Sequence, residues 1–243
     1  MNTFPFWSQR SFWIFRARPA ALVLLPALFL LGACTNQQDQ EVDQTAQQEF
    51  EEFKNDFQSS LEAADREIQQ VENRIDTSAD QVGEELESQI NQLQQRREDL
   101  KTELNQLKEA GREKTRELRS ELYQLEEDLQ IVQLNAIERK EEFVQATREE
   151  VQAINEDITR LDRKMENAGS EIRSEYKEQI ANLQDERAQL KTEISQLEEA
   201  SEQAFKDTRA ALAEDLAALR REVKEIGYEV EEALRSEPPN GDN

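Results

Sequence analysis

One long stretch of this chain, residues 49–234, contains no proline and carries apolar side chains at alternating steps of three and four residues. That spacing places them along one face of a helix, and so narrow a stripe is typical of helices that pack through a seam. It predicts an all-α fold of long amphipathic helices, arranged as a coiled coil or as antiparallel helical hairpins in a bundle. The stripe opens with Phe50, Phe53, Phe57, Leu61, Ala64, Ile68, Val71 and Ile75.

The helical stretch repeats itself after 90 residues. Without a gap, 13 of the 22 positions from 89 to 110 are identical to their counterparts 90 residues later. Charged helices resemble one another in composition, but several of these identities fall at polar positions, which indicates a duplication.

The stripe pauses at one position in each repeat, at residues 76–80 and again 90 residues later. In the second pause, Gly169 suits a helix C-cap and Ser170 suits the next N-cap. Each repeat is therefore expected to hold a helix of about 28 residues, a short turn and a longer helix. The longer helix either continues or breaks again, near Gly111 or Ser201, and the pattern favours neither.

The N-terminal part has the order of a secretory signal. Arg10, Arg16 and Arg18 precede an apolar run of about 12 residues, and no acidic residue occurs before Cys34. A membrane-spanning helix needs roughly 20 apolar residues, so this run is too short. It ends in Leu31-Gly32-Ala33-Cys34, which resembles the lipobox of bacterial lipoproteins.

This resemblance implies that the thiol of Cys34 is alkylated with a diacylglycerol and that Cys34 becomes the new N-terminus after cleavage. Lipid on Cys34 would then hold the protein to a membrane of the bacterial cell envelope. Thr35 follows the cysteine where an Asp could stand, which in relatives from Gram-negative bacteria resembles the signal for export to the outer membrane, facing the periplasm. The alternatives are an ordinary cleaved signal with a chance cysteine, or an uncleaved anchor.

Together these features divide the chain into five expected segments. They are a signal peptide at 1–33, a lipidated N-terminus and flexible tether at 34–48, helical repeat 1 at 49–137, helical repeat 2 at 138–235 and a disordered tail at 236–243.

The second repeat also resembles small bacterial coiled-coil proteins of undefined biochemical role. The resemblance covers about 60 residues, including Glu175-Tyr176-Lys177-Glu178-Gln179-Ile180 and the segment from Leu197 to Phe205. Those relatives often carry Trp where this chain has Phe205. The resemblance implies a helical bundle and no particular activity.

Composition excludes several kinds of chemistry. The chain has no His, and the one Cys is used by the anchor, which excludes a thiol nucleophile, a His base and a His or Cys metal site. Beyond Cys34 there are 27 Lys and Arg against 54 Asp and Glu, and this net charge of −27 disfavours nucleic-acid binding. We therefore expect no enzyme activity, no cofactor and no metal site.

The candidate for a specific polar feature is the pair Arg97 and Arg187, which occupy the same core-seam position in the two repeats. One interpretation is a polar layer that sets helix register or partner choice at a cost in stability. The other is that each side chain extends past the seam edge to a neighbouring Glu.

These observations predict a lipid-anchored structural or interaction protein of the cell envelope, acting as a non-catalytic scaffold, spacer or adaptor. Its coiled-coil seams are expected to serve a protein partner or self-association. The alternative is an amphipathic lipid-binding protein resembling the exchangeable apolipoproteins, which the narrow seams and the lack of Trp beyond Cys34 disfavour.

Overall fold

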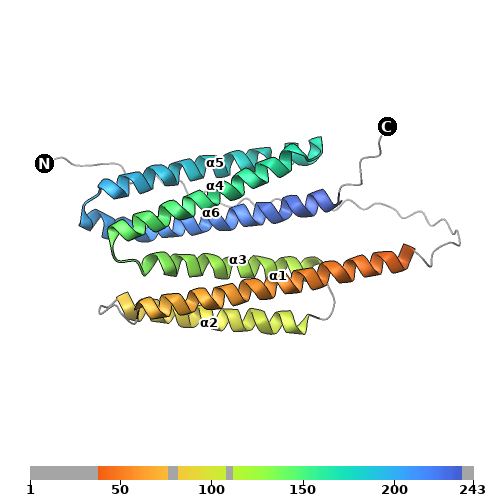
Figure 1. Ribbon diagram of the computed structural model, residues 1–243, viewed down its shortest axis with the longest axis horizontal. Coiled ribbons are helices and arrows are strands. Elements are labelled where there is room, and N and C mark those ends of the chain that lie inside the picture. The colour runs from red at the N-terminus through yellow and green to blue at the C-terminus, as the bar shows by residue number, and fades with distance from the viewer. Residues whose placement is uncertain (1–37, 76–81, 108–111, 237–243) are drawn as a thin grey trace, which may run out of the picture. The chain divides into compact units, whose positions relative to one another are not determined.

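The computed structural model describes residues 38–75, 82–107 and 112–236 (Figure 1). Within these ranges the chain forms helices and no strand, which confirms the predicted all-α fold. From Glu41 onward, the described residues make one compact unit. The helices are α1 (Gln38–Ile75), α2 (Val82–Gln106), α3 (Arg112–Asn135), α4 (Lys140–Glu166), α5 (Ser170–Glu199) and α6 (Glu202–Ser236).

The longer helix of each repeat is broken, which settles the alternative that the sequence left open. In repeat 1 it is divided into α2 and α3, and in repeat 2 into α5 and α6. Each repeat is therefore a unit of three helices, with α1, α2 and α3 in the first and α4, α5 and α6 in the second. Successive helices run in opposite directions, so each repeat is an antiparallel hairpin extended by a third helix (Figure 1).

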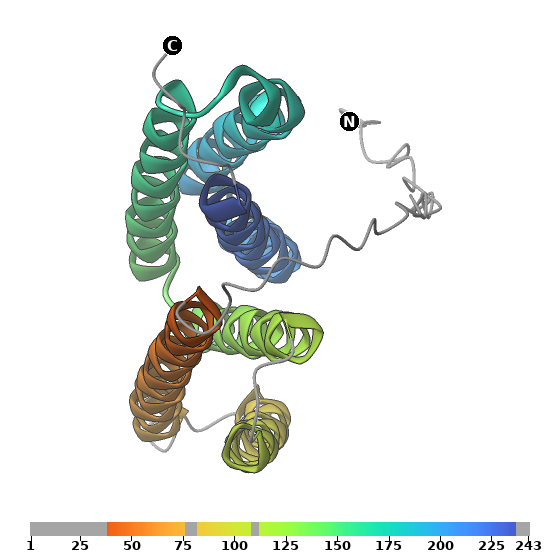
Figure 2. The same ribbon diagram turned by 90° about the vertical axis from the view of Figure 1, so that its right-hand side faces the viewer.

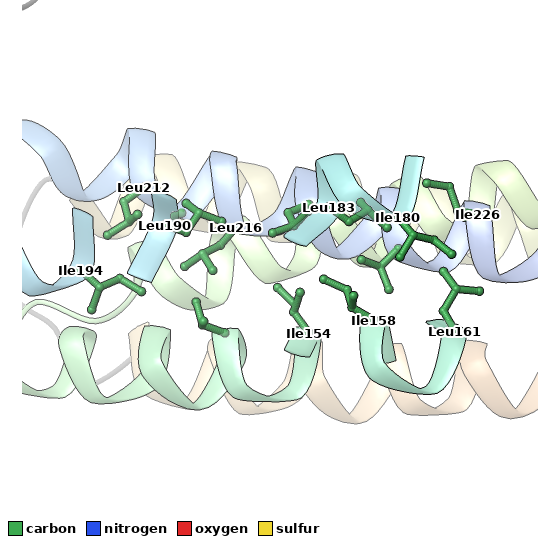
Figure 3. Packing of buried hydrophobic residues seen from close by; sticks show 14 of the residues in the cluster. Ile154, Ile158, Leu161, Ile180, Leu183, Leu190, Ile194, Leu212, Leu216 and Ile226 are labelled. Carbon is green, nitrogen blue, oxygen red and sulfur yellow. The ribbon is translucent and has the colours of Figure 1, made fainter. Parts of the chain in front are cut away.

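Each repeat buries its own apolar stripe. The cores form two separate clusters of buried side chains. One comes mainly from α1, α2 and α3, and the other comes mainly from α4, α5 and α6, with Leu134 of α3 added at one end. Figure 2 shows the two sets of three helices by colour. Figure 3 shows the second core, where α4, α5 and α6 contribute in turn. The side chains labelled there are Ile154, Ile158, Leu161, Ile180, Leu183, Leu190, Ile194, Leu212, Leu216 and Ile226.

The third helices correspond by a different shift from the rest of the repeat. The buried residues Leu118, Leu122, Leu125 and Leu129 of α3 match Leu212, Leu216, Leu219 and Val223 of α6, which lie 94 residues later. The additional four residues are close to one turn of helix, so the apolar stripe keeps the same face.

The break between α4 and α5 differs from the sequence prediction in its caps. Asn167, and not Gly169, is the C-cap of α4, and Gly169 is the N-cap of α5 in extended backbone with no side-chain cap. The side chain of Arg173 donates to the carbonyl oxygens of Glu166 at 3.2 Å and Ala168 at 2.8 Å. These bonds satisfy carbonyls at the end of α4 that a glycine C-cap would otherwise serve.

The break between α5 and α6 is stabilised at both ends. The Ser201 hydroxyl accepts a hydrogen bond from the backbone N–H of Ala204 at 3.3 Å, as an N-cap does. Lys140, at the start of α4, donates to the carbonyl oxygens of Glu198 and Ala200 at 3.2 and 2.9 Å. The corresponding residue Gly111 lies outside the described residues.

The tether predicted at 34–48 is wrong for most of its length, because α1 already begins at Gln38. The segment contains six Gln, and Gln is a good helix former, so a helix that is nucleated by its buried stripe extends at little cost through these residues. Over the described residues no helix combines the length and the hydropathy needed to cross a bilayer.

Candidate functional site

Of the residues singled out from the sequence, Cys34 lies outside the described residues, so the structure does not place the predicted lipidation site. The first described helix begins at Gln38.

Arg97 and Arg187 contact the facing helix at equivalent positions. Arg97 Nη2 lies 2.7 Å from Asp65 Oδ1 on α1, and its Nη1 lies 2.6 Å from Glu98 Oε1. Arg187 on α5 donates through Nη1 to Asn155 Oδ1 on α4. The Asn lies 90 residues after the Asp, so the same contact is kept in both repeats.

Both arginines are half-buried, and the Nε of each is buried without a hydrogen-bond partner. The Arg97 side chain is 16% exposed. The pair to Glu98 is the neighbouring contact expected of a side chain at the seam edge, whereas the bond to the facing helix is what a register-setting residue needs. The register-setting role stays a prediction.

The sequence did not predict the contact between the two repeats. This contact is polar, whereas the core of each repeat is apolar. We call it the junction; α3 and α6 lie side by side there and run antiparallel (Figure 1). Three ion pairs cross it at 2.7 Å each: Arg116 to Glu232, Arg221 to Glu127 and Lys224 to Glu126.

Arg119 of α3 lies at the middle of the junction between two aromatic rings. Its guanidinium carbon is 4.3 Å from the ring centre of Tyr228 on α6 and 5.2 Å from that of Phe53 on α1. Stacking of this kind suits the flat, weakly hydrated guanidinium. Burial raises the pKa of the neighbouring Tyr123 above its ordinary value, and the charge of Arg119 opposes that rise.

Two neighbouring cavities share Arg119, Tyr123 and Lys224 as lining residues. One, of about 250 Å³, is bordered by Phe53 and Phe57 of α1. The other, of about 290 Å³, extends between α3, α4 and α6, and we call it the Arg119 pocket. A third cavity, between α1 and α2, is lined by Glu72, Asn73, Ile75, Glu87, Ile90 and Asn91.

The seam between α5 and α6 brings acidic groups together where repeat 1 has an ion pair. In repeat 1, Arg96 of α2 pairs with Asp128 of α3. The counterparts of these two residues in repeat 2, by the shifts of 90 and 94, are Glu186 and Glu222, which we call the carboxylate pair.

The carboxylate pair has raised pKa values for two physical reasons. Burial is the larger cause of the rise in the pKa of Glu222, followed by the negative charge of Glu186 and then that of Glu225. The pKa of Glu186 is raised by burial and by Asp215. Glu229 lies seven residues after Glu222 on α6, and its pKa is raised by burial and by the charge of Glu225.

Of these features, the Arg119 pocket is the one equipped to hold a ligand. It has cationic and aromatic walls, whereas the described residues contain no cluster of three or more acidic, Cys or His side chains arranged to hold a metal ion. The sequence offered little signal for it, because its walls come from residues about 100 positions apart that look like ordinary charged helix surface.

Comparison with models of protein families, with characterised proteins and with solved structures found no match to this chain.

Proposed function

We propose that this chain is a lipid-anchored structural or interaction protein of the bacterial cell envelope, a non-catalytic adaptor that is held to the outer membrane through Cys34. The anchor is supported by the lipobox-like ending of an otherwise ordinary secretory signal.

The observation that carries the adaptor part of this proposal is the burial of the stripes within the repeats. The seam residues of all six helices pack inside the two cores, so they are not left over as apolar faces for lipid. What remains at the surface is helical, polar and acidic, with 54 Asp and Glu in the chain. Such a body suits contacts with other proteins better than insertion into a bilayer.

The anchor is tested by expressing the full chain and the Cys34→Ser variant in a bacterium that processes lipoproteins, with an alkyne-labelled fatty acid in the medium. The parent chain is expected to take up the label and to sediment with membranes. The variant is expected to remain unlabelled and of precursor size, while Thr35→Ser serves as the matched control. A parent chain without label would overturn the anchor.

The adaptor role is tested against the apolipoprotein-like alternative by amide hydrogen exchange of the full chain, in micelles and after transfer to phospholipid vesicles. A closed bundle keeps the slow exchange of the buried stretches around Ile68 and Ile158 in both settings. Loss of that protection on vesicles would mean that the helices open onto lipid, and the alternative would replace the adaptor.

A further inference from the structure

The lining of the Arg119 pocket brings several cations of this acidic chain together. The Arg119 pocket is lined by Arg119 of α3, Arg160 and Lys164 of α4, and Lys224 of α6. Two carboxylates, Asp157 and Glu231, line it as well, and Glu126 pairs with Lys224 beside it, so the four cations exceed the nearby carboxylates by one positive charge. The chain as a whole carries a net charge of −24, so this local excess of positive charge lies on a protein that otherwise repels anions.

Ion pairs hold three of these cations in place. Arg160 lies 3.0 Å from Asp157, Lys224 lies 2.7 Å from Glu126, and Lys164 pairs with Glu231. A Lys ammonium has three N–H donors and an Arg guanidinium has five, so each of these groups keeps donors that its ion pair does not use.

Arg119 is the exception, since no ion pair joins it to a carboxylate in the described part of the chain. Its guanidinium carbon lies 5.2 Å from the ring centre of Phe53 and 4.3 Å from that of Tyr228, and a side-chain hydrogen bond joins it to Tyr123, so part of its N–H edge remains for a partner. Its Nε is buried and has no hydrogen-bond acceptor. A guanidinium fixed in this way is arranged to bind a planar or tetrahedral oxyanion through two parallel hydrogen bonds.

The pocket also has room beside the charges. Gly227 of α6 borders it, and a Cβ built at this glycine meets no atom within 4 Å. Leu161 and Val223 supply an apolar part of the wall, and Tyr123 and Tyr228 supply aromatic ones. At about 290 Å³ the cavity is at the small end of the range for ligand sites.

From this combination we propose that the Arg119 pocket binds a phosphate group carried on a small organic portion of a few carbon atoms. Arg119 provides the bidentate contact, Lys224 and Lys164 add charge, and the apolar wall accommodates the carbon atoms. A free phosphate ester and the glycerophosphate headgroup of a lipid share this chemistry. A nucleic acid does not fit, since the acidic surface around the pocket repels a long polyanion.

The test uses the full chain in micelles of an uncharged detergent, with carbon-13 in the tyrosine rings. The chain has three tyrosines; Tyr123 and Tyr228 line the pocket, while Tyr176 lies on α5 outside its lining and serves as an internal reference. Inorganic phosphate is titrated against chloride at constant ionic strength. We expect saturable shifts of the Tyr123 and Tyr228 ring signals, with Tyr176 unmoved.

Three variants connect the shifts to the pocket. Arg119→Gln is expected to weaken binding at least about tenfold, the loss of one charge-assisted bidentate contact. Gly227→Leu places a larger side chain at the border of the pocket, where a Cβ meets no atom within 4 Å, and improves helix propensity, so the variant should remain folded and lose binding. Arg66→Gln, an exposed residue of α1, makes the same change of charge and should leave binding unchanged.

A second titration adds short-chain phosphatidylglycerol to the same micelles. Saturation by inorganic phosphate assigns the site to free phosphate compounds, and saturation by the lipid alone assigns it to a headgroup; both support the proposal. Absence of a saturable shift in either titration would overturn it. So would an equal weakening by Arg119→Gln and Arg66→Gln, since that would show general charge screening and no pocket.

Discussion

Arg97 of α2 lies 2.7 Å from the carboxylate of Asp65 on the facing helix α1. Ninety residues later Arg187 makes the same contact to Asn155, so the duplication has kept the position and exchanged a charged acceptor for a neutral one. Hydrogen bonds between two charged groups are stronger than those with one neutral partner. The contact between α1 and α2 in repeat 1 is therefore equivalent to the contact between α4 and α5 in repeat 2, but the two contacts differ in strength.

This difference gives the first prediction. Asn155→Asp should stabilise repeat 2 by about 0.5 kcal/mol, a typical value for a partly exposed pair. The reciprocal Asp65→Asn should weaken repeat 1 by a similar amount. Urea unfolding of the full chain measures both changes. A destabilising effect of Asn155→Asp would show that repulsion from the acidic surroundings outweighs the new pair.

The register-setting role of Arg97 is tested by Arg97→Leu. The substitution removes a half-buried charge whose Nε has no partner, so the free energy of unfolding should change by less than about 1 kcal/mol. If the arginine sets register, the α1–α2 amide signals in a nitrogen-15 spectrum should double, because the apolar seam alone allows more than one alignment. A single set of signals would assign Arg97 to the seam edge alone.

Charge reversal at the carboxylate pair gives the third prediction. Glu186→Arg recreates in repeat 2 the ion pair that Arg96 and Asp128 form in repeat 1. The melting temperature should rise, because a repulsive contact with Glu222 is replaced by an attractive one. The matched variant Arg96→Glu should lower it. Equal melting temperatures for the parent chain and both variants would contradict the correspondence between the two seams.

The pH dependence of stability follows from the same groups. Folding raises the pKa of Glu222 above its ordinary value of 4.5, mainly by burial and then by the charges of Glu186 and Glu225, with Arg221 opposing. The folded chain therefore holds this proton more tightly than the unfolded chain. The stability that Glu222 contributes through this difference is fully present below pH 4.5. It is lost as the pH rises through the folded-state pKa of Glu222.

Glu222→Gln removes this dependence and provides its measurement. The variant should be more stable than the parent chain at pH 7, and the difference should shrink as the pH approaches 4.5. Urea midpoints of both proteins at several pH values give the comparison, in which the many other carboxyls cancel. A difference independent of pH would mean that Glu222 does not titrate with folding.

The parts of this fold that could be predicted are those encoded by local spacing. Ile68 and Leu190 lie in the apolar stripe and are buried, because a period of three and four residues fixes the buried face of a helix. The junction could not be predicted in this way. Arg119 and Tyr228 lie outside the stripes and 109 positions apart, and nothing in their local sequence distinguishes them from other solvated residues. Their contact depends on how two completed units pack.

The aromatic pair in each core shows a second feature that spacing alone does not give. In repeat 1, Phe53 packs against Phe57 of the same helix, with ring centres 5.5 Å apart. In repeat 2 its counterpart Phe143 packs at the same distance against Phe205, which comes from α6. The counterpart of Phe57 is Thr147, a buried residue whose hydroxyl donates to the carbonyl oxygens of its own helix.

The ring that packs against Phe53 or Phe143 can therefore come from the first or from the third helix of a repeat. This gives the last prediction. Phe205→Ala alone should cost about 3–5 kcal/mol, because the side chain is fully buried. Thr147→Phe alone should cost about 1–3 kcal/mol by overpacking. In the double variant the new ring occupies the space that Phe205 leaves, as Phe57 does in repeat 1, so the combined loss should be smaller than the sum. Urea unfolding of the four proteins forms a double-mutant cycle, and strictly additive losses would show that the two ring positions are not interchangeable.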